Sequence, residues 1–343
     1  MTPTPVTDPA FAQVLAGDVA GAIRTYRDRL RAAPRDSDLH HSLGHLLLMT
    51  GDFAAGLEEC EWRRQPKGPP VPRWRGAPLN GARILVHGEQ GFGDNFQFVR
   101  YASLVADRGG KVVLGTRAGM KPLLMTVPGV VEVVSSGEPL ADIACHVPMM
   151  SLPYVFGTRL ETIPNAVPYM TADPARVAAW KQRLAAYPGL KVGLVWSGNT
   201  AAVYNKRRSP GFQALRPLID CPGVTAFGLQ MGGGREDLDG AALPGAFVDL
   251  GPDLTDFAET AAAMTALDLI VSPCTSTAHL AGALGRPLWV MLATAADWRW
   301  FLDRDDSPWY PTARLFRQAA EGDWTAPVAR MRADLERAAA KIA

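Results

Sequence analysis

The sequence lacks several features that define whole classes of protein. Lysine and arginine total 35 against 34 aspartate and glutamate, and a net charge of +1 excludes the broad basic field of a nucleic-acid-binding protein. Only four cysteines occur and none forms a C-x-x-C pair, so neither a zinc site nor a disulfide framework is expected, which fits a reducing cytosol. The P-loop, the G-x-S-x-G turn of hydrolases and the H-E-x-x-H zinc motif are also missing.

Long apolar runs are missing as well. The longest ones contain glycine, histidine or aspartate within about ten residues, whereas a membrane span needs about 20 apolar residues in succession. Residues 1–8 have no basic region and no apolar core, so they predict no signal peptide. Because 48% of the 343 residues are hydrophobic and 20% are charged, the composition predicts a cytoplasmic globular protein of two or more domains.

The first 66 residues contain a repeat. Gly17-Asp18 recurs as Gly51-Asp52, an offset of 34 residues, which is the period of tetratricopeptide helical hairpins. Small residues such as Ala22 and Gly44 would let the two helices of a hairpin approach closely. We therefore expect tetratricopeptide-like helices over 1–66, with an ordinary helical hairpin as the alternative, and a proline-rich linker over 67–80.

From residue 81 the pattern becomes alternating strand and helix, which predicts parallel sheets covered by helices on both faces. Asp173-Pro174 is typical of a helix start and separates two such series. The sequence predicts an α/β protein with two doubly wound, Rossmann-like domains over 81–172 and 173–324, the GT-B architecture, followed by a C-terminal helix over 325–343. The expected strands cover 83–87, 111–115, 130–134, 143–147, 191–196, 224–229, 247–250, 269–272 and 288–292; the expected helices cover 95–108, 120–126, 174–187, 212–220, 255–267, 276–284 and 325–342.

A glycine turn, G-E-Q-G-F-G-D at 88–94, joins the first strand to a helix. Such a turn lets backbone N–H groups face an anion or a polar ligand. Its spacing is not G-x-G-x-x-G, and Thr116 stands after the next strand where a dinucleotide site has an acid, so no NAD cofactor is expected. Asp94 closes the turn, and a simple helix cap is the alternative interpretation of that residue.

The strongest signal is C-T-S-T-A-H at 274–279, between a strand and a helix of small residues. Thr275, Ser276 and Thr277 would lie at the helix N-terminus, where free N–H groups and the helix dipole attract a diphosphate. His279 lies one turn further on, within reach of a phosphate oxygen. Ordinary capping with a buried histidine is the alternative.

Two further segments carry candidate binding residues. Lys206, Arg207 and Arg208 follow a strand and its S-G-N-T loop, which supplies Ser197 and Asn199, and one of the three cations could neutralise a phosphate. The segment 297–311 combines aromatic and charged residues, including Asp297 and Trp298, and such residues bind sugars. Its D-x-D spacing at 303–305 also occurs at 36–38 and 237–239, so it does not indicate a metal site.

Taken together, six blocks of the sequence resemble a known family. They look like bacterial tetratricopeptide proteins that end in a domain similar to the heptosyltransferases of glycosyltransferase family 9, some of which glycosylate flagellin. The blocks are residues 89–94, 97–101, 192–199, 275–287, 297–300 and 307–311.

The resemblance implies a role for individual residues. Gly93-Asp94 matches the Gly-Asp pair whose aspartate is the proposed catalytic base of the heptosyltransferases. Their donor motif, Asp-Thr-x-x-x-His-Leu-Ala, is matched at Thr275 and His279, but Cys274 occupies the aspartate position. A basic residue in the loop after the first strand of the second domain binds donor phosphate in that family, which Lys206, Arg207 or Arg208 would do here. Gln90, Gln97, Asp297 and Trp298 are candidates for contact with sugar or acceptor.

These inferences predict a GT-B glycosyltransferase that uses a nucleotide sugar, needs no catalytic metal or other cofactor, and transfers to a protein Ser/Thr hydroxyl bound by the helical segment. A non-catalytic scaffold of the same fold is the alternative that Cys274 suggests, and a nucleotide-sugar epimerase is a third. The architecture further implies that Asp94 and His279 face one cleft and that the C-terminal helix packs back on the first Rossmann-like domain.

Overall fold

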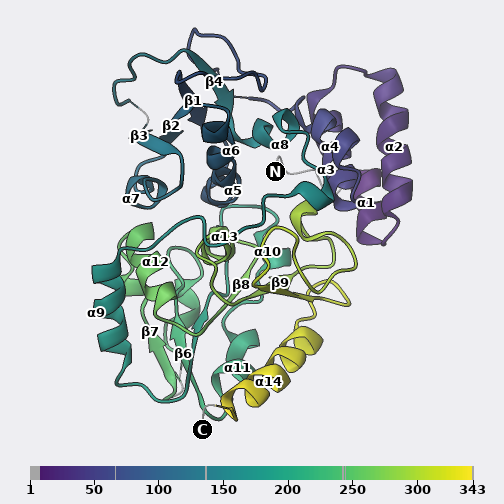
Figure 1. The fold of residues 1–343 in the computed structure, drawn as a ribbon. Coiled ribbons are helices and arrows are strands. Elements are labelled where there is room, and N and C mark those ends of the chain that lie inside the picture. The colour runs from purple at the N-terminus through teal and green to yellow at the C-terminus, as the bar shows by residue number, and fades with distance from the viewer. Residues whose placement is uncertain (1–7, 66, 136, 242, 244, 342–343) are drawn as a thin grey trace. The chain divides into compact units, whose positions relative to one another are not determined.

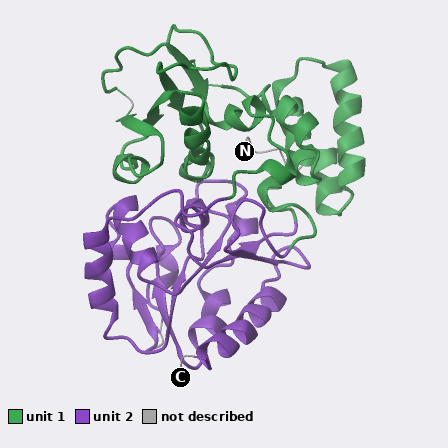
Figure 2. Cartoon of the chain, viewed as in Figure 1, with its two compact units in different colours: residues 1–165, 295–304 green, residues 166–294, 305–343 purple. Residues whose placement is uncertain are grey.

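The computed structural model describes residues 8–65, 67–135, 137–241, 243 and 245–341, arranged in two compact units (Figures 1 and 2). Unit 1 comprises residues 1–165 and 295–304, and unit 2 comprises residues 166–294 and 305–343. The expectation that residues 1–8 form no signal peptide therefore concerns residues almost wholly outside the described ones, and residues 342–343, at the end of the segment expected as the C-terminal helix, also lie outside them.

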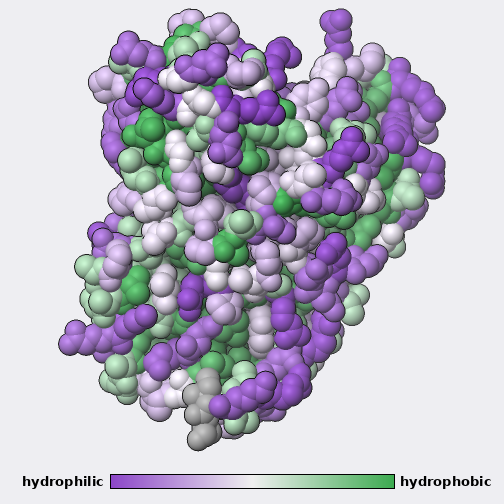
Figure 3. Space-filling model, in the orientation of Figure 1, coloured by the Kyte–Doolittle hydropathy of each residue, from purple (hydrophilic) through white to green (hydrophobic). Residues whose placement is uncertain are grey.

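Unit 1 begins with two helical hairpins: α1 (Pro9–Leu15) with α2 (Val19–Ala32), and α3 (Ser37–Met49) with α4 (Phe53–Cys60). Asp18 caps α2 and Asp52 caps α4, each by accepting a hydrogen bond from the backbone N–H three residues on. The glycine before each aspartate has a positive φ, so the 34-residue offset reflects two hairpins with the same turn. Hydrophilic side chains line the outer face of α2 (Figure 3).

The close helix approach expected at Gly44 is confirmed. A β-carbon at Gly44 would lie 2.9 Å from the carbonyl oxygen of Gly56 and 2.8 Å from the sulfur of Cys60, so α3 and α4 are in contact through backbone. Ala22 of α2, which the 34-residue offset aligns with Gly56 of α4, is completely buried. Both hairpins therefore depend on a small residue at the position where the two helices meet.

The helices continue into a four-stranded parallel sheet in the order β3-β2-β1-β4. Its strands are β1 (Arg83–His87), β2 (Lys111–Thr116), β3 (Val130–Ser135) and β4 (Cys145–Pro148), and its short helices are α5 (Phe92–Phe98), α6 (Ala102–Asp107), α7 (Lys121–Leu124) and α8 (Leu152–Val155). All four expected strands are present. The single helix expected over 95–108 is instead α5 and α6 joined by a 3-10 turn.

A buried ion pair connects the helical hairpins to this sheet. Arg63, just after α4, donates to Glu89 from Nε (3.1 Å) and Nη2 (2.8 Å), and both side chains are only 3% exposed. Glu89 also accepts from the backbone N–H of Met150, and Arg63 also donates to Ser151. Glu89 of the glycine turn therefore has a structural role, because it holds the helical segment against the turn between β1 and α5.

Unit 2 contains a six-stranded parallel sheet in the order β10-β9-β8-β5-β6-β7. Its strands are β5 (Leu190–Leu194), β6 (Val224–Gly228), β7 (Phe247–Asp249), β8 (Leu269–Pro273), β9 (Leu288–Leu292) and β10 (Ala313–Arg317); the helices are α9 (Pro174–Leu184), α10 (Asn205–Arg208), α11 (Arg216–Ile219), α12 (Phe257–Thr265), α13 (Ser276–Ala283) and α14 (Thr325–Ala339). Strand β10 and helix α10 are not in the sequence prediction. Asp173 caps α9 as expected.

The C-terminal helix was predicted to pack on the first Rossmann-like domain, and this prediction is wrong. Helix α14 buries Val328, Met331 and Leu335 in the core of unit 2, together with Phe212 of the α11 region, and not against the first Rossmann-like domain. The three- to four-residue spacing of its apolar residues predicts that one face is buried, but many apolar surfaces satisfy that spacing. Figure 1 shows α11 and α14 together on one side of the sheet.

The domain limits also differ from the expected ones. Residues 295–304, expected within 173–324, are part of unit 1, because Trp298 and Arg299 are buried against its helices. In the part of the chain that the structure describes, no helix is both long and apolar enough to cross a bilayer.

Candidate functional site

The glycine turn of unit 1 places Asp94 at the carboxyl end of β1. Gly88 is required there, because a β-carbon would lie 2.0 Å from the side-chain oxygen of Asn95. Asn95 in turn donates to the carbonyl oxygen of Gly91 (2.8 Å), which tightens the turn. Gly91 is the N-cap of α5, and Asp94 is the third residue of the helix, where its side chain accepts from the Gly91 N–H as in a capping box. The alternative interpretation of Asp94 as a helix cap is therefore met in this form.

The two carboxylate oxygens of Asp94 each accept a hydrogen bond. One carboxylate oxygen accepts from the backbone N–H of Gly91 (2.9 Å), and the other accepts from Nη2 of Arg299 (2.6 Å), which lies 205 residues further along the chain. Each carboxylate oxygen has two acceptor positions, so both retain one for another donor. The side chain is partly open to solvent, at 19% exposure.

Arg299 belongs to this candidate site, and the sequence analysis did not single it out. It lies in the 3-10 turn Trp298–Trp300, is 5% exposed, and donates from Nη1 to Asp297 (2.9 Å) and from Nε to the side-chain oxygen of Gln97. We call Arg299 with Asp94, Gln97 and Asp297 the Arg299 cluster. The D-W-R-W block at 297–300 led to the prediction of Asp297 and Trp298 as binding residues. Nothing in that block indicates that the arginine pairs with Asp94.

Three of the four residues expected to contact sugar or acceptor lie in or beside this cluster. Gln97 is completely buried and holds Arg299, so in this structure it offers no surface to a ligand. Asp297 and Trp298 flank Arg299 in sequence, and the guanidinium carbon lies 4.8 Å from the centre of the Trp298 ring. Gln90 is half-buried in the turn, and no hydrogen bond among the described residues joins it to the cluster.

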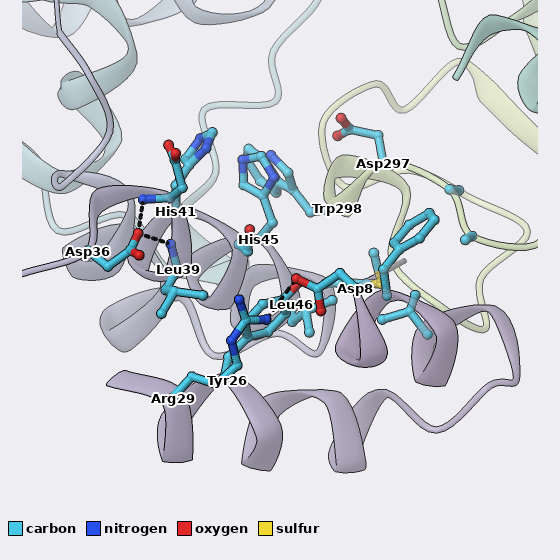
Figure 4. A pocket seen from close by; sticks show the side chains of 17 residues that line it. Asp8, Tyr26, Arg29, Asp36, Leu39, His41, His45, Leu46, Asp297 and Trp298 are labelled. Carbon is cyan, nitrogen blue, oxygen red and sulfur yellow. Dashed lines mark hydrogen bonds and ion pairs between the residues drawn. The ribbon is translucent and has the colours of Figure 1, made fainter. Parts of the chain in front are cut away.

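A pocket of about 330 Å³ opens beside the cluster, within unit 1. Its walls come from α1, α2 and α3 and from the loop that carries Asp297 and Trp298 (Figure 4). His41 and His45, one turn apart on α3, line it, and Figure 4 shows His45 beside Trp298. Asp8, Tyr26 and Arg29 lie along another part of the wall, where Asp8 and Arg29 form an ion pair of 2.8 Å.

The charges on this wall are fixed by burial and by Arg299. Burial lowers the pKa of His41 from 6.5 to about 4 and the pKa of His45 well below 6.5, so both imidazoles are neutral at pH 7. Burial alone would raise the pKa of Asp297, but the positive charge of Arg299, with its hydrogen bonds, holds that pKa well below the usual value. Asp297 is therefore a carboxylate shared between the pocket and the Arg299 cluster.

In unit 2 the expected donor residues lie at the carboxyl end of β8. Thr275 is the N-cap of α13, and its hydroxyl lies 3.0 Å from that of Ser272. Ser276 and Thr277 occupy the first turn and are half-buried, so the free N–H groups of that turn and their hydroxyls lie together. This is the arrangement that binds phosphate oxygens at a helix N-terminus.

His279 is held by a residue outside the predicted site. Its Nδ1 lies 2.8 Å from the hydroxyl of Tyr310, and both side chains are buried. Gly282 makes room for this tyrosine, because a β-carbon at position 282 would lie 2.3 Å from the Tyr310 ring. The sequence offered only a weak signal for Tyr310, as one of several aromatic residues in 297–311.

The structure distinguishes the three consecutive cations. Arg208 donates from Nη1 to the carbonyl oxygen of Cys274 (2.8 Å) and stacks on Tyr204, so it reaches the loop that precedes α13. Arg207 instead pairs with Glu321 (2.9 Å), and Lys206 is exposed. Only Arg208 is therefore brought to the predicted phosphate site.

Ser197 and Asn199 lie in the loop after β5. Gln230, which the sequence analysis missed, is buried and accepts from the backbone N–H of Ser197 (2.9 Å), while Asn205 donates to the Ser197 hydroxyl (3.2 Å). Asn199 accepts from the N–H of Ala201, as in a local turn. Ser197 is thus fixed on the same loop system as Arg208, whereas Asn199 only shapes its turn.

Over the described ranges, no three histidine, cysteine, aspartate or glutamate side chains lie close enough together to hold a metal ion.

No protein-family model matches the chain. Protein FlbA of Caulobacter vibrioides is 28% identical over 362 aligned positions, which cover 94% of this chain and 59% of that protein. The chain thus spans about three-fifths of the length of this curated relative.

Solved structures match more weakly in sequence but clearly in fold. The E. coli ADP-heptose LPS heptosyltransferase II is 14% identical with a TM-score of 0.50, over 75% of this chain and 99% of that one. The glycosyltransferase family 9 structure from Veillonella parvula is 9% identical with a TM-score of 0.51, over 71% of this chain and 88% of that one. The chain therefore has a GT-B-like fold, of the kind seen in family 9 heptosyltransferases, with a helical segment at its N-terminal side.

Proposed function

We propose that the chain is a glycosyltransferase that transfers a sugar from a nucleotide-sugar donor to a protein Ser/Thr hydroxyl, as in flagellin-type O-glycosylation. The observation that carries the proposal is the donor site of unit 2. There the first turn of α13, the hydroxyls of Thr275 to Thr277 and the guanidinium of Arg208 lie around one loop. Such a set of donors suits a nucleoside diphosphate, the leaving group of the reaction.

The proposed reaction breaks the bond between the anomeric carbon and the donor diphosphate and forms a bond to the acceptor oxygen. Asp94 takes the proton of the acceptor hydroxyl, through a lone pair not used by Gly91 or Arg299. The nucleoside diphosphate leaves with the bonding electron pair, and Arg208 and the N–H groups of α13 stabilise its charge. His279, oriented by Tyr310, donates to a phosphate oxygen. No step requires a metal ion, so the rate is expected to be unchanged by EDTA.

We propose the pocket in unit 1 as the acceptor site. Its walls combine the apolar and aromatic side chains of α1 to α3 with polar groups such as His41, and Asp297 belongs to both the pocket and the cluster that holds Asp94. A peptide bound along α3 would thus lie next to the segment that contacts the proposed base.

The test is a transfer assay with a panel of nucleotide sugars, with release of nucleoside diphosphate and the mass of the protein acceptor as readouts. Asp94→Asn is expected to lower kcat by roughly 10²- to 10⁴-fold, the usual contribution of a general base. His279→Ala is expected to weaken donor binding. Wild-type rates in both variants would refute the mechanism.

A non-catalytic scaffold is the second candidate, and two observations favour it. Cys274 occupies the aspartate position of the donor motif, and both oxygens of Asp94 already accept hydrogen bonds. Calorimetry separates the two functions, because a scaffold with a degenerate site would bind none of the nucleotides. An epimerase would turn over the donor sugar without any acceptor.

A further inference from the structure

Arg299 is a buried charge whose position is fixed from several directions. At 5% exposure it has little access to water, and a buried guanidinium is stable only when its donors are paired. Arg299 donates from Nη2 to Asp94, from Nη1 to Asp297 and from Nε to the side-chain oxygen of Gln97. The planar fork of an arginine fixes the angles among these partners, which a lysine would not do.

Two aromatic rings restrict the guanidinium further. Its central carbon lies 5.2 Å from the ring centre of Phe98 and 4.8 Å from that of Trp298. Phe98 is at the end of α5, the helix that carries Asp94, whereas Trp298 lines the pocket. The position of Arg299 is therefore set jointly by the helix that bears the proposed base and by the pocket wall.

We infer that Arg299 is a positioning residue that orients the Asp94 carboxylate. We further infer that it couples this orientation to the pocket formed by α1 to α3 and Asp297–Trp298. The inference rests on the proposed function for the role of Asp94 as base. Arg299 holds one oxygen and the backbone N–H of Gly91 holds the other, so the plane of the carboxylate is defined before an acceptor arrives. Preorganisation of this kind keeps the reacting groups in a productive geometry.

The coupling to the pocket passes through Asp297. This residue lines the pocket, caps the turn that contains Arg299, and accepts from its Nη1. His45, on α3, lines the same pocket as Asp297. A ligand that displaces Asp297 or Trp298 would therefore also displace Arg299 and, with it, Asp94.

The experiment compares Arg299→Gln, Arg299→Lys and the control Arg100→Gln in the full chain. Arg100 is equally buried in the same unit but donates to the carbonyl oxygens of Gln97 and Pro164. Arg299→Gln is expected to lower kcat by roughly 10²-fold, the cost of misplacing a reacting group by about 1 Å, with an unchanged KM for the donor. Arg299→Lys should recover part of that loss, and Arg100→Gln should keep kcat close to wild type.

A second readout does not depend on activity. The ¹³Cγ resonance of Asp94, identified by its disappearance in Asp94→Asn, should move in Arg299→Gln and stay in place in Arg100→Gln. If the wild type transfers no sugar but the resonance moves, the proposed function fails and the orientation of Asp94 by Arg299 stands. If the resonance does not move, or if kcat falls equally in Arg299→Gln and Arg100→Gln, the inference is overturned.

Discussion

Glu89 lies in the glycine turn that resembles a ligand-binding motif. Its contacts nevertheless predict that substitution of Glu89 lowers the free energy of unfolding. Glu89→Gln removes the negative charge opposite Arg63, where both side chains are 3% exposed. Loss of one partner from a buried ion pair costs about 3–5 kcal/mol. Glutamine keeps one acceptor oxygen and Arg63 keeps Glu61 (2.8 Å), so we expect a loss of about 2–3 kcal/mol.

For a unit of this size that loss corresponds to a fall in Tm of roughly 4–12 °C. The measurement is chemical and thermal unfolding of the full chain, followed by near-UV circular dichroism. The matched control is Glu132→Gln, which breaks the half-exposed pair with Arg83 (2.6 Å) and should cost less than about 1 kcal/mol. Equal stability of the two variants would refute the reasoning. At a temperature where both are folded, nucleotide affinity should match wild type, because Glu89 lies outside unit 2.

Three further outcomes are expected. Arg208→Ala should weaken nucleoside diphosphate binding by roughly 10- to 100-fold in calorimetry, because it removes a charge-assisted hydrogen bond. Arg207→Ala should change that affinity little, and equal losses in the two variants would contradict the assignment of Arg208 to the phosphate site. Gly282→Ala should force the Tyr310 ring away and destabilise the chain by about 1–3 kcal/mol, with a parallel loss of nucleotide affinity. His41, whose pKa burial lowers from 6.5 to about 4, binds a proton more readily in the unfolded chain, so stability should fall as the pH drops from 6.5 to 4 and then level off. His41→Gln should remove up to ~3 kcal/mol of that pH-dependent loss, and an unchanged slope of stability against pH would show that His41 is not its source.

The sequence by itself determined the class of fold and most of the local structure. Strands such as β1 and β9 coincide with the predicted ranges, because short apolar runs between glycine turns are buried on both faces of a parallel sheet. Asp173 caps α9, and Asp18 and Asp52 start equivalent helices, because capping depends on residues within one turn of each other.

The tertiary structure alone decided which side chains meet at the candidate sites. Asp94 and Arg299 are 205 residues apart, and His279 and Tyr310 are 31 apart, so neither pair leaves a periodic signal in the sequence. Arg208 is one of three adjacent cations that look equivalent in one dimension; it differs because it stacks on Tyr204 and reaches Cys274.

The same holds for the C-terminal helix. The stripe of Val328, Met331 and Leu335 shows that one face is buried, but an apolar face has no direction or specificity of its own. Its partner depends on which complementary apolar surface the rest of the chain leaves uncovered, and the folded chain provides that surface on unit 2. Local patterns therefore specify the elements, whereas long-range packing and the pairing of buried charges specify the sites.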